Sequence, residues 1–149
     1  MSNYLLDAAL LLAIKAHAGQ KDKGGQPYIL HPLRVMLSME TDDERLVALL
    51  HDVFEDSPTP LSALERQGFP QHIIDAVVAL TRNDGEDYFN YIERVGSNPL
   101  ARAVKMADLA DNMDITRLPR LSNEDFLRLK RYARAKRALE YCDGVIAMV

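Results

Sequence analysis

The sequence predicts an all-α protein, a compact multi-helix bundle of about seven to nine helices joined by short loops. Apolar residues recur at helical spacing along most of the 149 residues, and no segment alternates apolar and polar residues as a half-buried strand would. Proline, glycine and helix-capping residues interrupt these segments at short intervals. The length suits one domain, residues 1–149, with a full hydrophobic core.

The first predicted helix covers residues 4–18 and is apolar on nearly every face, which indicates deep burial. Gly19 ends this helix, and a polar, glycine-rich loop follows over residues 20–27. Because such a loop is exposed, it is well placed to contact a ligand. Pro32 suits the first turn of a second helix, which is expected to run to about residue 39.

Capping residues and prolines mark out the remaining helices. Thr41 and the acidic residues after it cap a third helix, which is expected to reach Asp56 and to end before Pro58. Pro60 opens a short helix, with Thr59 as its cap. Further helices are predicted over residues 71–80, 86–95 and 99–116, and from about residue 122 towards the C-terminus.

The third predicted helix carries an unusual set of polar groups at its C-terminal end. In a continuous helix, His51 and Glu55 share one stripe, and Asp52 and Asp56 share the adjacent stripe. One imidazole and three carboxylates therefore lie on a single side of this helix. Residues 46–65 contain no lysine or arginine that would neutralise them. The segment predicts that an external cation binds beside it.

A second acidic helix is predicted later in the chain. Asp108 lies next to its apolar stripe, with Lys105 three residues before it and Asn112 four residues after it. These three side chains are expected to share one edge of the helix, which faces a cleft. Asp111 and Asp114 are expected to point elsewhere. From this helix alone, a salt bridge between Lys105 and Asp108 is a sufficient explanation of the pattern.

The overall composition argues against two classes of partner. A net charge of −4 gives no support for binding a nucleic-acid polymer or an anionic membrane surface. Cys142 is the one cysteine, which excludes an intrachain disulfide and a cysteine-based zinc site and fits a reducing, cytoplasmic location. The apolar run at residues 8–14 is too short to span a bilayer. Whether the chain forms a homo-oligomer stays open.

Four short motifs occur in order along the chain. They are His17-Ala18-Gly19-Gln20, Pro27-Tyr28-Ile29-Leu30-His31-Pro32, Leu49-Leu50-His51-Asp52-Val53-Phe54-Glu55-Asp56, and Val104-Lys105-Met106-Ala107-Asp108 with Asn112. In this order and at these spacings, they resemble the HD-domain metal-dependent phosphohydrolases. Within that superfamily, the similarity is to the hydrolase domains of RelA/SpoT-type alarmone enzymes and their small stand-alone relatives, whose known members are all-helical.

The resemblance implies a set of functional residues. One divalent cation, usually Mn²⁺ and alternatively Fe²⁺ or Zn²⁺, would be held by His31, His51, Asp52 and Asp108. Glu55 and Asp56 match the catalytic acidic pair, which orients or activates the attacking water, and Asn112 matches a residue near the substrate sugar. An anionic substrate also requires basic groups at the rim of so acidic a pocket. The substrate-binding candidates of this kind are Lys21, Lys23, Arg82 and Lys105.

The function that the resemblance implies is hydrolysis of a small-molecule nucleotide, as by a guanosine-3′,5′-bis(diphosphate) 3′-pyrophosphohydrolase. One position departs from the family pattern, because Asp22 stands where the alarmone hydrolases carry an arginine that helps to hold the guanine nucleotide. Two alternatives therefore stay open. One is an HD-domain hydrolase of another nucleotide or pyrophosphate ester, and the other is a non-catalytic, metal-containing helical module that binds a ligand.

Several other polar and aromatic residues have structural interpretations. His17 is expected to orient the loop after it through a hydrogen bond, and Tyr88 and Tyr91 are expected to form core or cleft wall. The basic residues of the last helix are interpreted as a solvated helix face. They are Arg128, Lys130, Arg131, Arg134, Lys136 and Arg137.

Overall fold

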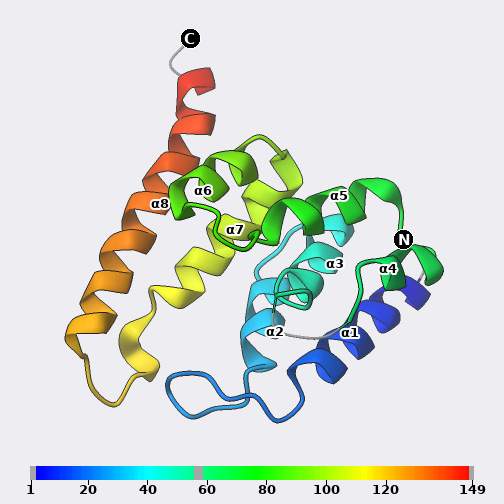
Figure 1. Cartoon of the computed structure of the whole chain (residues 1–149), viewed down its shortest axis with the longest axis horizontal. Coiled ribbons are helices and arrows are strands. Elements are labelled where there is room, and N and C mark those ends of the chain that lie inside the picture. Colours follow the sequence, from blue (N-terminus) through cyan, green and yellow to red (C-terminus); the bar gives the residue numbers. More distant parts are fainter. Residues whose placement is uncertain (1–2, 56–58, 148–149) are drawn as a thin grey trace.

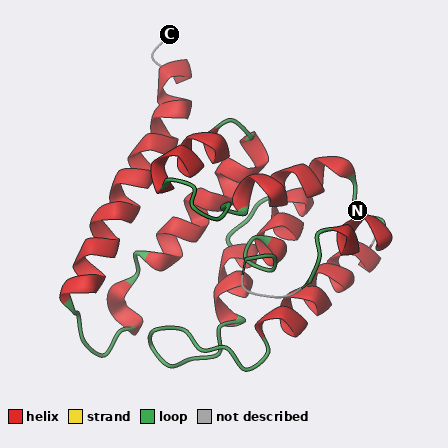
Figure 2. Cartoon of the chain, viewed as in Figure 1, coloured by secondary structure: helices red, strands yellow, loops and turns green. Residues whose placement is uncertain are grey.

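The computed structural model describes residues 3–55 and 59–147, and within these ranges eight α-helices and one 3₁₀ helix form a bundle (Figures 1 and 2). The described residues contain no strand, only an isolated bridge between Lys21 and Pro27, so the all-α prediction is confirmed. The helices are α1 (Asn3–His17), α2 (Leu30–Leu37), α3 (Asp42–Leu50), α4 (Ser62–Arg66), α5 (Gln71–Leu80), α6 (Tyr88–Gly96), α7 (Pro99–Asn112), η1 (Ile115–Arg117) and α8 (Asn123–Ala147).

Helix α3 forms the centre of the bundle. Residues 46–50 are apolar throughout and at most 1% exposed. Because this half of the helix is apolar on every side, it packs against α1, α2, α5 and α7 at once. Full burial of each leucine in it contributes about 1.5–3 kcal/mol of hydrophobic stabilisation. The well-packed end of α3 therefore anchors the residues that follow it.

Helix α8 and the loop between α1 and α2 lie at the periphery of the bundle. Helix α8 packs against α6 and α7, and its C-terminal end projects beyond the other helices (Figure 1). The loop between α1 and α2 approaches η1 closely. A Cβ atom at Gly24 would lie 2.7 Å from the carbonyl oxygen of Arg117, so a larger residue would push these two segments apart.

Helix α1 is less deeply buried than its composition predicts. Ala8, Ala9 and Ala13 are buried, but Leu11 is 66% exposed and Ile14 is 47% exposed. The physical reason is that α1 lies at the edge of the bundle, where α3 is its principal packing partner and covers one face. Within the described ranges, no helix is both long and apolar enough to cross a membrane.

The third helix is shorter than the sequence predicts. It ends at Leu50, and the residues from His51 onward form a turn in which the amide of Val53 donates to the carbonyl of Leu50 at 3.2 Å. This three-residue spacing tightens the chain and ends the regular helical pattern. The expectation that one continuous helix carries all four polar groups to Asp56 is therefore wrong, and Asp56 itself lies outside the described residues.

Smaller differences occur at other helix boundaries. Helix α2 ends at Leu37, and the predicted helix over 99–116 is divided into α7 and η1. The division occurs because the side chain of Asp114 accepts from the amide of Thr116 and starts a new turn. The short helix begins at Ser62 rather than Pro60, and Asp87 caps α6 one residue after its predicted start.

Replacing Thr41 with alanine is expected to lower the free energy of unfolding by about 1 kcal/mol, measured by urea denaturation. Thr41 and Glu44 form a reciprocal capping box at the start of α3, in which the threonine hydroxyl accepts from the amide of Glu44 at 3.2 Å. The control is Thr41→Ser, which keeps the oxygen and should retain most of the stability. Equal losses in both variants would show that the cap is not responsible.

Candidate functional site

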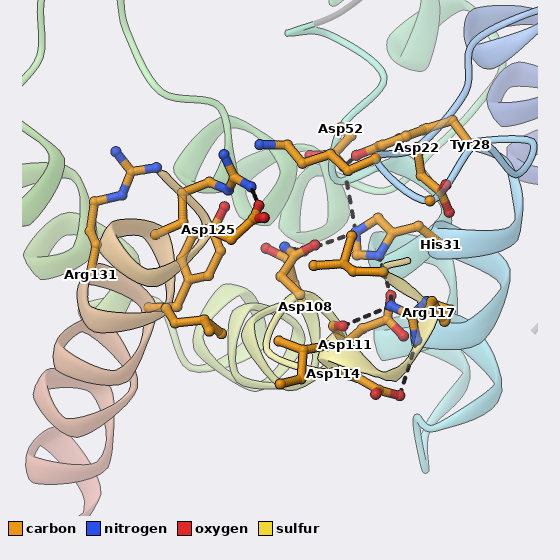
Figure 3. A pocket seen from close by; sticks show the side chains of 18 of the residues that line it. Asp22, Tyr28, His31, Asp52, Asp108, Asp111, Asp114, Arg117, Asp125 and Arg131 are labelled. Carbon is orange, nitrogen blue, oxygen red and sulfur yellow. Dashed lines mark hydrogen bonds and ion pairs between the residues drawn. The ribbon is translucent and has the colours of Figure 1, made fainter. Parts of the chain in front are cut away.

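Side chains from three parts of the bundle converge at one point. His31 lies in α2, His51 and Asp52 follow α3, and Asp108 lies in α7. The Nε2 atoms of His31 and His51 are 3.3 Å apart, and Oδ1 of Asp108 lies 2.9 Å and 3.4 Å from them. Oδ2 of Asp52 lies 3.7 Å and 3.1 Å from the same two nitrogens. The structure thus brings the four predicted metal ligands together, as Figure 3 shows for His31, Asp52 and Asp108.

Both imidazoles are oriented by hydrogen bonds from their other nitrogen. Nδ1 of His51 donates to the carbonyl of Ala48 at 2.6 Å, and Nδ1 of His31 donates to Oδ2 of Asp111 at 2.6 Å. A carbonyl or carboxylate can only accept, so the proton of each neutral ring lies on Nδ1. Nε2 of each ring is then the atom that faces the cluster, which is the arrangement found in histidine metal ligands.

Asp111 holds His31 in place, so the expectation that it points elsewhere is wrong. Besides the bond from His31, its carboxylate accepts from Nε of Arg34 at 2.8 Å and from Nη2 of Arg34 at 3.0 Å, and Arg117 lies 3.4 Å away. Burial alone would raise the pKa of Asp111, but the hydrogen bonds from His31 and Arg34 hold it well below its usual range. Asp114 also lines the cavity and pairs with Arg117.

The cluster is rich in buried charge. Burial would lower the pKa of His51, but the carboxylates of Asp52 and Asp108 raise it well above its usual value. Burial would also lower the pKa of His31, but its hydrogen bonds to Asp108 and Asp111 raise it. When the two imidazoles are protonated, the protons on their Nε2 atoms occupy the positions where a cation would bind. His31, His51 and Asp108 form a group whose ligand atoms all lie within 4.8 Å of one another and that can hold a metal ion.

The predicted edge of α7 is present beside this cluster. Nζ of Lys105 donates to Oδ2 of Asp108 at 2.8 Å, and the amide of Asn112 donates to Oδ1 at 3.0 Å. Burial would lower the pKa of Lys105, but Asp108 raises it well above its usual value, so the ammonium keeps its charge. The lysine also lies 5.4 Å from the ring centre of Tyr91. Lys105 therefore holds Asp108 by the oxygen that points away from the imidazoles, and Asn112 holds it by the oxygen that faces them.

These residues lie at the floor of a cavity of about 480 Å³. His51 is 2% exposed and lies below its surface, and Asp56 is outside the described residues. The other predicted site residues all line the cavity, namely Lys21, Lys23, His31, Asp52, Glu55, Arg82, Lys105, Asp108 and Asn112. Tyr88 and Tyr91 form part of the wall, as expected.

Helix α8 supplies a wall of the cavity that the sequence pattern did not predict. Arg128 and Arg131 line the cavity, so the interpretation of the basic residues as a wholly solvated face is wrong for these two. The guanidinium of Arg131 lies 4.6 Å from the ring centre of Tyr88. A signal was present, because Arg128 and Arg131 continue the helical stripe of the buried Ala135 and Leu139.

Glu55 and Asp22, which both line the cavity, have hydrogen-bond partners in the protein. Oε1 of Glu55 accepts from the backbone amide of Arg82 at 2.6 Å, while the guanidinium of Arg82 donates to the carbonyl of Glu86. In the loop between α1 and α2, Oδ1 of Asp22 accepts from the amide of Gln26 at 2.9 Å. The carboxylate thus stabilises its own loop while it lines the cavity.

Comparisons with known proteins agree with these features. No family model matches the chain. The bifunctional (p)ppGpp synthase/hydrolase SpoT of Escherichia coli is 32% identical over 123 residues, and a guanosine-3′,5′-bis(diphosphate) 3′-pyrophosphohydrolase of Aquifex aeolicus is 30% identical over 120 residues. Each alignment covers 72% of this chain and 17% of the relative. The chain thus spans about a sixth of the length of these curated relatives.

A solved structure shares the fold. A metazoan ortholog of SpoT that hydrolyses ppGpp has a TM-score of 0.74, with 91% of this chain and 84% of that chain covered at 20% identity. The helical bundle and its buried histidine–aspartate cluster agree with the resemblance to HD-domain proteins. The chain is homologous to the SpoT/RelA-type (p)ppGpp hydrolase and synthetase proteins, as the motifs predicted.

Replacing Asp111 with asparagine is expected to weaken binding of a divalent cation at this cluster by about 10- to 100-fold, because the carboxylate that orients His31 is lost. Isothermal titration calorimetry measures the change. Asp75→Asn is the matched control, since Asp75 lies on α5, is exposed and does not line the cavity. An unchanged affinity in the Asp111 variant would contradict the role assigned to this residue.

Proposed function

We propose that the chain is a metal-dependent phosphohydrolase that removes pyrophosphate from the 3′ position of guanosine-3′,5′-bis(diphosphate). The observation that carries the proposal is the convergence of His31, His51, Asp52 and Asp108 at the floor of a cavity whose wall carries both cationic and acidic side chains. These four residues are the proposed ligands of one Mn²⁺ ion. Two imidazole nitrogens and two carboxylate oxygens also suit Fe²⁺ or Zn²⁺.

The proposed reaction is hydrolysis at the phosphorus attached to the 3′ oxygen. Water forms a new bond to this phosphorus, the bond from phosphorus to the 3′ oxygen breaks, and pyrophosphate and guanosine 5′-diphosphate result. A divalent cation bound at the floor would lower the pKa of a water molecule and offset charge on the phosphate. Glu55 is the proposed acceptor of the proton from water, because its exposed carboxylate lies at the cavity wall and the amide of Arg82 fixes it. The motif assigns Asp56 to the same pair.

The cations of the rim are the proposed binding groups for the substrate phosphates. Burial lowers the pKa of Lys23, and the neighbouring charge of Arg128 lowers it further. Asp125 pairs with Arg128 and opposes part of this effect on Lys23, so a substrate phosphate is proposed to bind the two cations beside this carboxylate. Lys21 and Arg82 are proposed to contribute to the same field. Lys105 and Asn112 flank Asp108, where they are proposed to position the sugar and the reacting phosphate.

A second candidate function is hydrolysis of a different nucleotide or pyrophosphate ester by the same residues. Asp22 favours this alternative, because it places a carboxylate in the cavity wall where the family pattern has an arginine. A carboxylate repels phosphate and accepts hydrogen bonds instead of donating them. The floor of the cavity, and hence the proposed chemistry, is the same in both cases.

The decisive experiment is a product-release assay with purified protein and Mn²⁺. Guanosine-3′,5′-bis(diphosphate), GTP, deoxynucleoside triphosphates and 3′-phosphorylated nucleotides are supplied separately. We expect pyrophosphate release from the first compound, and a fall of more than about 100-fold in Asp52→Ala, since losing a ligand costs more than losing the partner of a ligand. Asp75→Ala is the matched control and should keep its activity.

The assay separates the candidate functions. Hydrolysis of another nucleotide alone, dependent on Asp52, would contradict the proposed substrate and support the second candidate. Metal binding without turnover of any compound would instead indicate a non-catalytic module. If Asp52→Ala bound Mn²⁺ as tightly as the unchanged protein, the proposed ligand set would be wrong.

The affinity for Mn²⁺ is expected to rise with pH through and above about pH 6.5, the ordinary pKa of imidazole. The pKa values of His31 and His51 are both raised, so at lower pH their Nε2 atoms hold protons that the cation must displace. Each proton released changes the affinity by up to about tenfold per pH unit. Calorimetry in two buffers of different ionisation enthalpy counts the released protons. A pH-independent affinity would show that the imidazoles are not ligands.

A further inference from the structure

Tyr28 contacts one of the proposed metal ligands directly. Its hydroxyl donates a hydrogen bond to Oδ2 of Asp52 at 2.5 Å, in the range of bonds to a charged carboxylate. The same oxygen lies 3.1 Å from Nε2 of His51 and 3.7 Å from Nε2 of His31. The hydroxyl therefore binds the carboxylate oxygen that faces the interior of the cluster. In Figure 3, Tyr28 and Asp52 lie next to each other above His31.

Tyr28 is itself held from several sides. Its amide donates to the carbonyl of Gln20 at 2.8 Å, and its ring centre lies 4.8 Å from that of His17 and 5.6 Å from that of His31. Nδ1 of His17, which is 2% exposed, bonds to the side chain of Gln20 at 3.0 Å, as the sequence predicted. The loop that carries Lys21 and the tyrosine are therefore fixed against each other.

The geometry of this contact restricts the carboxylate of Asp52. A carboxylate group on a short side chain can rotate, and its two oxygens are chemically equivalent. A hydroxyl anchored on one side selects one orientation and keeps Oδ2 beside the two imidazoles. The partner groups of metal ligands commonly act in this way, by fixing the ligand before the metal arrives.

We propose that Tyr28 is a positioning residue that fixes the carboxylate of Asp52 for cation binding and ties this ligand to the loop at the cavity entrance. The proposal rests on the proposed metal site. It assigns the tyrosine a function in the cluster beyond its packing against His17. It also connects the floor of the cavity with the segment that carries Lys21 and Lys23.

The test is Tyr28→Phe, which keeps the ring and removes only the hydroxyl. Its Mn²⁺ affinity, measured by calorimetry, is expected to fall by about 10- to 100-fold. The electron paramagnetic resonance spectrum of its bound Mn²⁺ is expected to differ from that of the unchanged protein, because one ligand is no longer held in a single orientation. Tyr132→Phe is the control, since this variant also removes a hydroxyl from a tyrosine that lines the cavity.

Three results would overturn the proposal. Equal Mn²⁺ affinities and spectra in Tyr28→Phe and the unchanged protein would show that the hydroxyl does not position Asp52, while the proposed metal site would stand. A metal-free Tyr28→Phe protein that no longer melts cooperatively would show that the residue holds the fold instead. If the unchanged protein bound no Mn²⁺, the proposed function would fail first and this proposal with it.

Discussion

The burial of two imidazoles among carboxylates is the constraint on which the rest of the structure depends. Charged groups removed from water are costly unless opposite charges or hydrogen bonds compensate them. Each carboxylate of the cluster has such compensation: Asp111 from arginines, Asp108 from Lys105, and Asp52 from Tyr28. These partners come from separate segments of the chain. The compensation therefore holds α2, α7 and the loop before α2 in a fixed relation to the end of α3.

The fold was predictable where local signals decide the structure. Helical periodicity, the Thr41 cap and the glycine-rich loop each have a local physical cause, and the structure shows the corresponding elements. The exposure of Leu11 in α1 was not predictable, because a helix that is apolar all round does not reveal which of its faces finds a partner. The early end of α3 was missed because the spacing of its polar residues was compatible with a continuing helix.

The candidate site was likewise predictable only in part. The positions of His31, His51, Asp52 and Asp108 near one another followed from motifs, each of which is short and local. Asp111 was missed although it follows Asp108 by one helical turn. Its role depends on a hydrogen bond with His31, which lies in another helix. Arg131 was missed because a basic helix face is usually solvated, although this residue continues the helical stripe of the buried Ala135 and Leu139.

The position of α8 has a consequence for how a ligand and the fold stabilise each other. One wall of the cavity comes from this helix and the facing wall includes the loop after α1, so the two walls are distant in sequence. Helix α8 packs mainly on α6 and α7, and its C-terminal end projects beyond the other helices (Figure 1). A molecule that contacts both walls binds only the state in which α8 is packed against the bundle. Such a ligand therefore stabilises the packed position of α8, and its binding affinity includes the free energy of keeping α8 in place.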